Sequence, residues 1–191
     1  MVILSTILGG ASGMSLWGGG TTNRSSRLYR ALVETGLASD VDCALTSTID
    51  PYLFSFSATV SEDRTLAEVE AALLEEIRRV IDEPVSEAEL AKAIKQTRAQ
   101  FAYSSESVTD QAYWLGFSQL LADVGWFENF LEHIAAVTVA DVQRTAQQYF
   151  KPAQRNIGWY VPQRNGNGSA SDAEGAEPTD EAGMAEEALD A

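Results

Sequence analysis

The hydrophobic pattern changes its period between residues 41 and 60, and this change constrains the fold more than any other feature. In each half of this range, every second residue is apolar, with Ser47 as the exception. These residues are Val41, Cys43, Leu45, Ser47 and Ile49, followed by Tyr52, Phe54, Phe56, Ala58 and Val60. A period of two is typical of strands that bury one face. Because Asp50-Pro51 separates the two halves, we predict an antiparallel hairpin whose apolar face must be covered.

Five helical segments follow the hairpin and can provide that cover. Four of them begin with a hydroxyl residue that stands three positions before an acidic one, the pattern of a capping box. These pairs are Thr65 with Glu68, Ser86 with Glu89, Ser107 with Asp110, and Thr138 with Asp141. The remaining segment is short and carries Trp126, Phe127, Phe130, Leu131 and Ile134. Helical spacing alone accounts for the aromatic residues, so we expect them in the core and not in a cofactor site.

The apolar stripes that we expect to face inward are regular in four of these segments. They contain Leu66, Val69, Leu73, Ile77 and Val80, then Leu90, Ile94, Thr97 and Phe101, then Tyr113, Trp114, Phe117, Leu120 and Leu121, and finally Val142, Ala146, Tyr149 and Phe150. A last strand is predicted over residues 156–161, where it can rejoin the hairpin.

Two more helices are predicted before the hairpin. Residues 1–8 are apolar, but no basic residue precedes them and Gly9 and Gly10 interrupt the run, so we interpret them as a buried helix and not as a signal peptide. This helix has no capping residue, and we therefore expect an N-terminally truncated domain. The other helix should run from Ser25 or Ser26 to about Thr35, with Gly36 after its end. The order of elements predicts an α+β domain, an antiparallel sheet covered on one face by helices.

The charge of the chain divides it at about residue 164. The net charge is −15, and residues 165–191 hold eight of the acidic residues and no Lys or Arg. We predict a folded domain over 1–164 and a disordered acidic tail over 165–191. The chain lacks a run of Lys or Arg, which argues against nucleic acid and against anionic membrane surfaces as partners. No segment reaches the length of a membrane span, and a cytoplasmic location is slightly favoured.

A glycine-rich segment precedes the second helix. It reads GGASGMSLWGGGTTNRSSRLY over residues 9–29, and its glycines are Gly9, Gly10, Gly13, Gly18, Gly19 and Gly20. Glycines in such density suggest a loop shaped for contact or for movement, and a plain surface linker is the alternative. No Lys-Ser or Lys-Thr pair follows the glycines and no strand precedes them, so neither a P-loop nor a dinucleotide site is predicted.

The chain has no recognisable active site of its own. A zinc site of the HExxH or HxxEH type needs two histidines one helical turn apart, whereas His133 is the only histidine. We expect His133 at the surface and no metal bound by this chain. No histidine stands in the sequence to activate a serine or Cys43, and we expect Cys43 to be a buried strand thiol.

Several stretches, taken in order, resemble the C-terminal domain of the insulinase or pitrilysin-type zinc metallopeptidases, the inverzincins, which include the mitochondrial processing peptidase. These stretches are ILGG at 7–10, SSRLYRALVETGLAS at 25–39, EPVSEAELAKAIKQ at 83–96, AAVTVADVQRTAQQYF at 135–150 and GWYVP at 158–162. They span nearly everything before the acidic tail.

The resemblance implies one half of a clamshell. In that family a separate domain or subunit carries HxxEH and the zinc, and the C-terminal domain closes over the peptide. The glycine-rich loop looks like one associated with substrate recognition, which implies peptide contact by its six glycines and, nearby, by Arg27 and Arg30. The resemblance also places Leu32 and Ser39 where many members have an Arg and a Tyr that reach the substrate.

Two functions follow from this resemblance. The first is a non-catalytic, substrate-cradling domain of a zinc endopeptidase, inactive alone, whose partners are an HxxEH-bearing half and a peptide. The second is a structural or interaction protein that keeps the fold without proteolysis, and the residues at positions 32 and 39 favour it. Self-association to a homo-oligomer is compatible with both.

Overall fold

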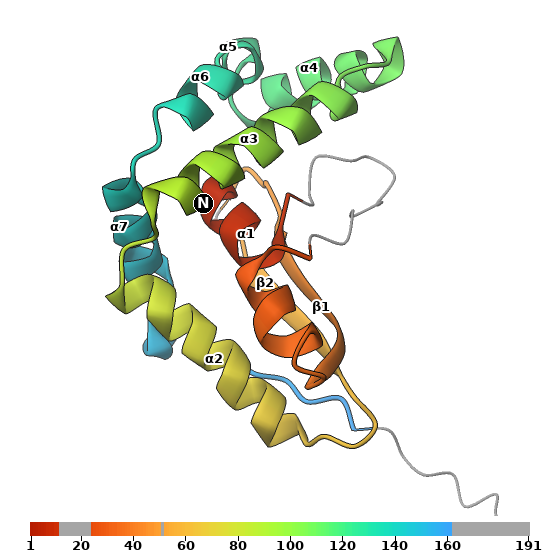
Figure 1. Ribbon diagram of the computed structural model, residues 1–191. Coiled ribbons are helices and arrows are strands. Elements are labelled where there is room, and N and C mark those ends of the chain that lie inside the picture. Colours follow the sequence, from red (N-terminus) through yellow and green to blue (C-terminus); the bar gives the residue numbers. More distant parts are fainter. Residues whose placement is uncertain (12–23, 51, 162–191) are drawn as a thin grey trace, which may run out of the picture. The chain divides into compact units, whose positions relative to one another are not determined.

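The computed structural model describes residues 1–11, 24–50 and 52–161, and residues 1–157 form one compact unit. Its elements, labelled in Figure 1, are α1 (Val2–Gly9), the π-helical turn η1 (Tyr29–Val33), β1 (Ala38–Leu45), β2 (Phe54–Val60), α2 (Leu66–Asp82), α3 (Glu87–Ser104), α4 (Val108–Leu121), α5 (Val124–Glu128), α6 (Phe130–Ala135), α7 (Val139–Tyr149) and the short 3-10 turn η2 (Pro152–Gln154).

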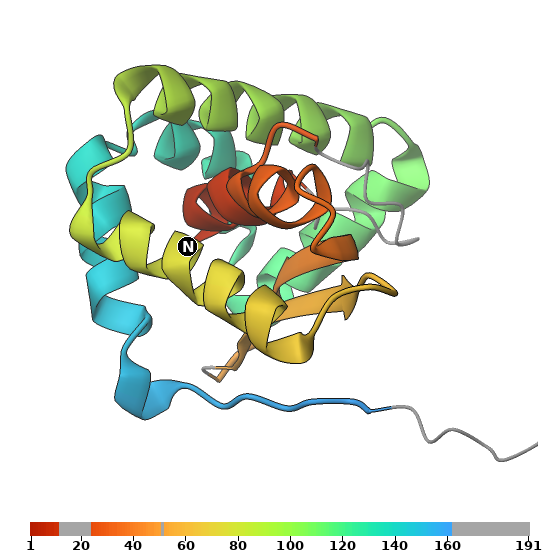
Figure 2. The same ribbon diagram turned by 60° about the horizontal axis from the view of Figure 1, so that its bottom comes forward.

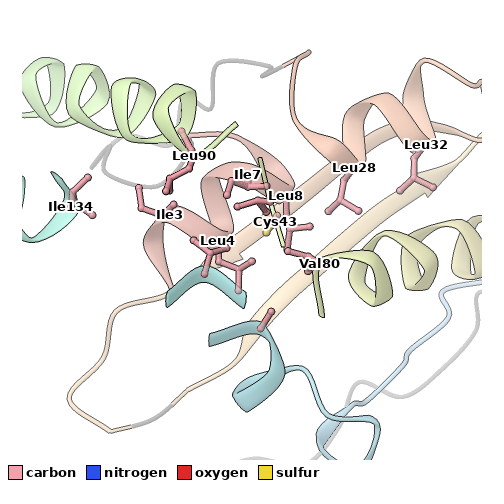
Figure 3. Close-up of a cluster of buried hydrophobic side chains, with 14 of the residues drawn as sticks. Ile3, Leu4, Ile7, Leu8, Leu28, Leu32, Cys43, Val80, Leu90 and Ile134 are labelled. Atoms are coloured by element: carbon pink, nitrogen blue, oxygen red, sulfur yellow. The ribbon is translucent and has the colours of Figure 1, made fainter. Parts of the chain in front are cut away.

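Helix α1 is buried, as the sequence predicted, and it lies at the centre of this unit. Figure 2 shows it between α2 and α3, and it also contacts β1 and α7. Its apolar residues leave almost no surface exposed, with Leu4 at 1% and Leu8 at 0%. In Figure 3 these side chains meet others from η1, β1, α2, α3 and α6. A helix that is apolar on most of its circumference is stable only when it is enclosed in this way.

The predicted hairpin is present, but its strands end before the predicted turn, because Ile49 and Tyr52 lie outside both strands and are exposed. Strands β1 and β2 pair antiparallel, with Cys43 opposite Phe56 and Leu45 opposite Phe54. The register shifts between Ala38 and Asp40, which marks a β-bulge at the start of β1. The two strands form the whole sheet in the described part of the chain. One face packs against α1, η1, α2 and Phe150, and the other carries exposed polar residues.

Side-chain caps begin the long helices where the sequence placed them. Complete capping boxes join Thr65 to Glu68 at α2 and Thr138 to Asp141 at α7. Ser107 caps α4 by accepting the N–H of Asp110. Because each cap satisfies N–H groups that the first turn leaves without a partner, these short motifs fix the helix starts.

Three other expectations about secondary structure and burial are wrong. Residues 156–161 form no strand, and the Tyr160 side chain is 89% exposed. The short aromatic helix is two helices, α5 and α6, which meet at Asn129 because its amide side chain donates to the Gly125 carbonyl. The third error concerns side chains expected in the core, since Tyr113, Leu120 and Tyr149 are exposed.

None of the helices in the described ranges has the length and apolar character needed to cross a membrane.

Candidate functional site

The glycine-rich segment leaves the core through Gly9 and Gly10, at the end of α1. A side chain on Gly9 would overlap the Cys43 side chain, so α1 can lie directly on β1 only with glycine at this position. Gly10 has a φ of 98°, and its N–H donates to the Thr6 carbonyl at 2.9 Å. Both glycines thus have a structural reason to be glycine. The other predicted contact residues of this segment, Gly13, Gly18, Gly19 and Gly20, lie outside the described residues.

The chain re-enters the described part at Arg24, and α3 holds this end of the segment. Lys92 Nζ donates to the Ser25 carbonyl at 3.3 Å, and Gln96 Nε2 lies 3.5 Å from Ser25 Oγ. The neighbouring Ser26 is buried, and its hydroxyl accepts the N–H of Tyr29. The predicted cap of the second helix is therefore at Ser26, and both described ends of the glycine-rich segment are fixed to the core.

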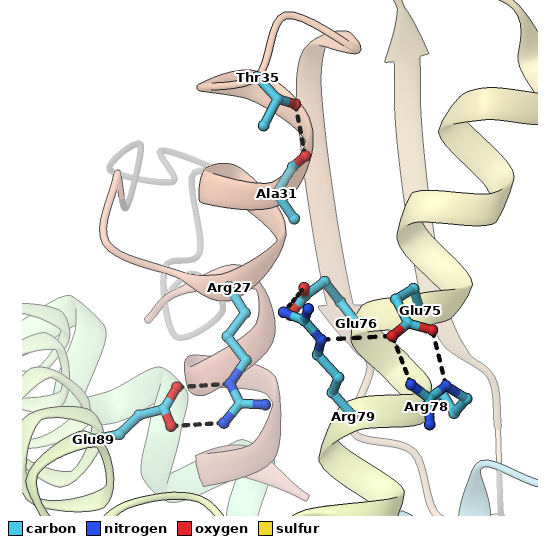
Figure 4. Close-up of polar contacts among 8 residues, drawn as sticks. All are labelled: Arg27, Ala31, Thr35, Glu75, Glu76, Arg78, Arg79 and Glu89. Atoms are coloured by element: carbon cyan, nitrogen blue, oxygen red, sulfur yellow. Dashed lines mark hydrogen bonds and ion pairs between the residues drawn. The ribbon is translucent and has the colours of Figure 1, made fainter.

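Arg27 makes the strongest contact at this end. Its Nε and Nη2 each donate to one carboxylate oxygen of Glu89 at 2.8 Å, in the two-bond geometry shown in Figure 4. The Arg27 and Glu89 side chains are only 20% and 29% exposed. The hydrogen bonds to Arg27 lower the pKa of Glu89, and the same bonds raise the pKa of Arg27. The pair is charged at neutral pH and holds η1 against α3.

Glu89 is the residue whose role the sequence pattern missed. Its position after Ser86 predicted a capping box, and Ser86 does cap α3 by accepting the Glu89 N–H. The Glu89 carboxylate pairs with Arg27 instead of completing the box. Glu89, Lys92 and Gln96 recur at helical spacing on one side of α3. This row of polar residues was the one sequence feature that could have predicted a polar contact on this side of α3.

The turn after Arg27 is a π-helix, which exposes Arg30 and buries its neighbours. The N–H of Glu34 donates to the Tyr29 carbonyl at 3.0 Å, five residues back, as a π-turn requires. Leu28 and Leu32 have 0% exposure and anchor the turn in the core, whereas Arg30 points outward and is exposed. The structure thus separates the two predicted cations: Arg27 is held by α3, and Arg30 faces solvent.

The positions that the resemblance pairs as Arg and Tyr also differ from each other. Leu32 is fully enclosed in the core, so its side chain does not reach a ligand at the surface. Ser39 is exposed and donates its hydroxyl to the Thr59 carbonyl at 3.3 Å across the hairpin. Neither residue can provide the charge or the phenol that the resemblance assigns there.

The described residues offer no catalytic or metal-binding constellation. His133 is exposed on α6, and no group of three or more His, Cys, Asp or Glu side chains among the described residues could hold a metal ion. Cys43 is 2% exposed, and burial raises the pKa of its thiol to about 12, so it is protonated at neutral pH. These residues do not fit a zinc site, and no step through zinc is assigned to this chain.

The sequence matches a known family over its first half. Residues 1–97 correspond to the domain described as the peptidase M16 inactive domain. This range contains α1, the glycine-rich segment, η1, the hairpin, α2 and most of α3, and it includes both residues of the Arg27–Glu89 pair. No curated protein matches the chain significantly.

Solved structures share the fold over most of the chain. A candidate zinc protease from Bordetella pertussis Tohama I is 25% identical with a TM-score of 0.70, and the match covers 85% of this chain and 83% of that one. The inactive peptidase domain of a candidate zinc protease from Bordetella parapertussis is 24% identical, with a TM-score of 0.71 and coverage of 85% and 82%. A protease from Helicobacter pylori is 23% identical, with a TM-score of 0.69; the match covers 80% of this chain but 34% of that one.

Proposed function

The chain belongs to the peptidase M16 family through that family's inactive domain, and from this premise we propose that it cradles a substrate peptide for a separate catalytic half. The observation that carries the proposal is the match to the inactive domain in a chain whose only histidine is His133. Zinc and the catalytic base then come from an HxxEH-bearing partner, and this chain contributes binding and orientation.

The peptide-contacting part of the proposal is the glycine-rich segment with Arg27 and Arg30. Gly9 and Gly10 end α1 in fixed positions, and Arg27 fixes the other end through Glu89. Arg30 is exposed on the adjacent turn, where it can meet a carboxylate or a carbonyl of a peptide. The assignment of Gly13, Gly18, Gly19 and Gly20 as peptide contacts rests on the sequence.

Reconstitution tests the proposed role. The purified chain alone should bind no stoichiometric zinc and should not cleave an internally quenched peptide library. Mixed with a zinc-bearing M16 subunit from the same organism, it should raise cleavage above that of the subunit alone. Tight zinc binding at one ion per chain would show that the assignment as a non-catalytic half is wrong.

Two variants test the peptide contacts separately from folding. Deletion of Gly18 to Gly20 should leave the thermal midpoint nearly unchanged but weaken peptide binding, and an unchanged affinity would make the segment a linker. Arg30→Ala should weaken peptide binding about tenfold, the effect of one lost charge-assisted hydrogen bond. Arg78→Ala is the matched control, because Arg78 is equally a surface arginine but lies on α2.

A second function, that of a structural or interaction subunit without proteolysis, is favoured by Leu32 and Ser39. The enclosed Leu32 and the hydrogen-bonded Ser39 cannot provide a substrate-directed Arg and Tyr. Under this alternative, the chain still forms a complex with the zinc-bearing subunit, but the complex cleaves peptides no faster than that subunit alone. Size-exclusion chromatography combined with the cleavage assay therefore separates the two functions.

A further inference from the structure

The exposed face of α4 has a composition that solvent contact does not explain. Every exposed residue of this helix is uncharged: Val108, Thr109, Gln111, Ala112, Tyr113, Leu115, Gly116, Gln119 and Leu120. Val108 and Leu120 leave 81% and 67% of their surface exposed. A helix that faces only water normally carries charged residues on that side, and a continuous uncharged face with large apolar residues is typical of a protein contact.

The interior of the molecule gives no reason for the small residues on this face. A side chain added at Gly116 would meet nothing within 4 Å, so the fold does not need glycine there. Glycine inside a helix costs about 1 kcal/mol relative to alanine. Ala112 lies one turn before Gly116 on the same side, so these two positions carry only a methyl group and a hydrogen atom beside the larger Tyr113, Leu115 and Leu120. Small residues one turn apart allow the backbone of another helix to come close.

The surroundings of α4 are acidic without compensation. Residues 99–143 contain no Lys or Arg but hold Glu106, Asp110, Asp123, Glu128, Glu132 and Asp141. Of these, Asp110 accepts the Ser107 hydroxyl, Asp123 caps α5, and Asp141 pairs with Arg144 on α7. Glu106, Glu128 and Glu132 are exposed and form no ion pair with any described residue. Glu106 lies just before α4, Glu128 is on α5 and Glu132 is on α6. Helix α5 contacts both α4 and α6, and Figure 1 shows the three helices together along α3.

We propose that the exposed face of α4 docks a helix of another protein that carries apolar residues flanked by Lys and Arg. The uncharged face provides the apolar contact, and the unpaired carboxylates on the neighbouring segments select a cationic partner. A second copy of this chain would bring two acidic rims together, and an anionic lipid surface would be repelled for the same reason. The inference does not depend on peptide binding by the glycine-rich segment.

A pair of synthetic peptides tests the proposal with the full chain. One helical peptide of about 18 residues has Ala and Leu on one face and Lys on the other, and its control has Glu in place of each Lys. Fluorescence anisotropy of the labelled peptides measures binding. We expect the Lys peptide to bind at least about tenfold more tightly than the Glu peptide at low salt. The difference should shrink between about 20 mM and about 300 mM salt as the charges are screened.

Three variants locate the binding site. Gly116→Leu should fold normally, because the space beside it is open, and should weaken binding of the Lys peptide about tenfold by blocking close approach. Ala71→Leu on the exposed side of α2 is the matched control and should change nothing. Glu106→Gln combined with Glu128→Gln should reduce the preference for Lys over Glu without removing the apolar contact.

Some outcomes would overturn the proposal. No binding of the Lys peptide, equal affinity for both peptides, or an affinity that Gly116→Leu leaves unchanged would each show that this face is not a cationic docking site. Sedimentation that reveals a dimer, which Gly116→Leu abolishes, would assign the face to a second copy of the chain and would equally overturn it.

Discussion

Helices α2 and α4 are built by the same local rules but face their surroundings differently. Each begins at a hydroxyl cap and runs for several turns. The inner side of α2 buries Val69 and Val80, and its outer side carries Arg78, which pairs with Glu75 (Figure 4) and also with Asp82. Helix α4 buries only Trp114 and Ser118, and its outer side has no charged residue at all.

This difference shows which helix sides have suitable surroundings within this chain and which do not. On α2, the apolar side packs against the core and the charged side faces water, so each side has the surroundings that suit it. On α4, the inner side is buried, but the outer side faces water without charged residues. We infer that α4 is fully folded in this chain, but that its exposed side is suited to contact with another protein. Four variants or pairs of variants test this difference between α2 and α4, from the largest expected effect to the smallest.

The largest effect should come from placing the same polar residue on the inner side of α2 and on the outer side of α4. Val80→Gln puts an amide into a fully buried position and should reduce the free energy of unfolding by about 3 kcal/mol. Leu120→Gln should change it by less than about 0.5 kcal/mol, because this side chain is exposed. Urea unfolding measures both. A large loss with Leu120→Gln would show that this face is packed in solution and would remove the contrast.

A smaller effect is expected for Trp114, the large buried residue of α4. Trp114 is 8% exposed, and its indole N–H donates to the Ser104 carbonyl at 3.1 Å. Trp114→Phe should cost about 1–2 kcal/mol, because it removes this hydrogen bond and leaves the carbonyl without its partner. The neighbouring Tyr113, which is 39% exposed, provides the control, and Tyr113→Phe should be neutral in the same unfolding measurement. Equal losses would mean that the Trp114 hydrogen bond is not what attaches α4.

Exchanging glycine and alanine between the two outer sides should give effects of opposite sign. Gly116→Ala should stabilise the protein by about 0.5–1 kcal/mol, since nothing obstructs the methyl group and the unfolded chain loses freedom. Ala71→Gly on α2 should destabilise it by about the same amount. Thermal unfolding monitored by circular dichroism can measure both. A destabilising Gly116→Ala would indicate that glycine is required by the fold itself.

The smallest effect concerns the ion pairs on α2. Arg78→Gln should lower the thermal midpoint by less than about 3 °C, and the loss should disappear at high salt, because all these side chains are exposed. The hydrogen bond from Arg78 lowers the pKa of Glu75, so the contribution of the pair is present above the ordinary pKa of a glutamate and is lost as the pH falls through the lowered value. A midpoint that is independent of salt in both proteins would contradict this account.

The elements that the sequence predicted correctly are those that local rules determine. The hairpin follows from the period of two, and the starts of α2 and α7 follow from hydroxyl–acid pairs whose partners stand three residues apart. The positive φ of Gly36, 72°, agrees with its predicted place after the second helix. In each case the interacting residues are close in the sequence, so the pattern contains the necessary information.

The features that escaped prediction depend on residues far apart. Glu89 had two possible partners, the Ser86 backbone nearby and Arg27 sixty-two positions earlier, and only the fold decides between them. The π-turn after Arg27 could not be predicted either, because Leu28 and Leu32, four positions apart, fit an ordinary α-helix equally well. The exposure of Leu120 is a comparable case: helical spacing shows that residues share a side, but not whether this chain covers that side.

The contact between α1 and β1 also gives the protein a buried thiol that can report local opening. Cys43 is the only cysteine, and its sulfur lies under α1, 3.9 Å from the Ser5 hydroxyl. Because Cys43 is 2% exposed, a thiol reagent reaches it only when the protein opens locally around it. When reclosing is fast, the alkylation rate reports the population of this open form, and the same thiol can report whether a bound partner makes the open form rarer.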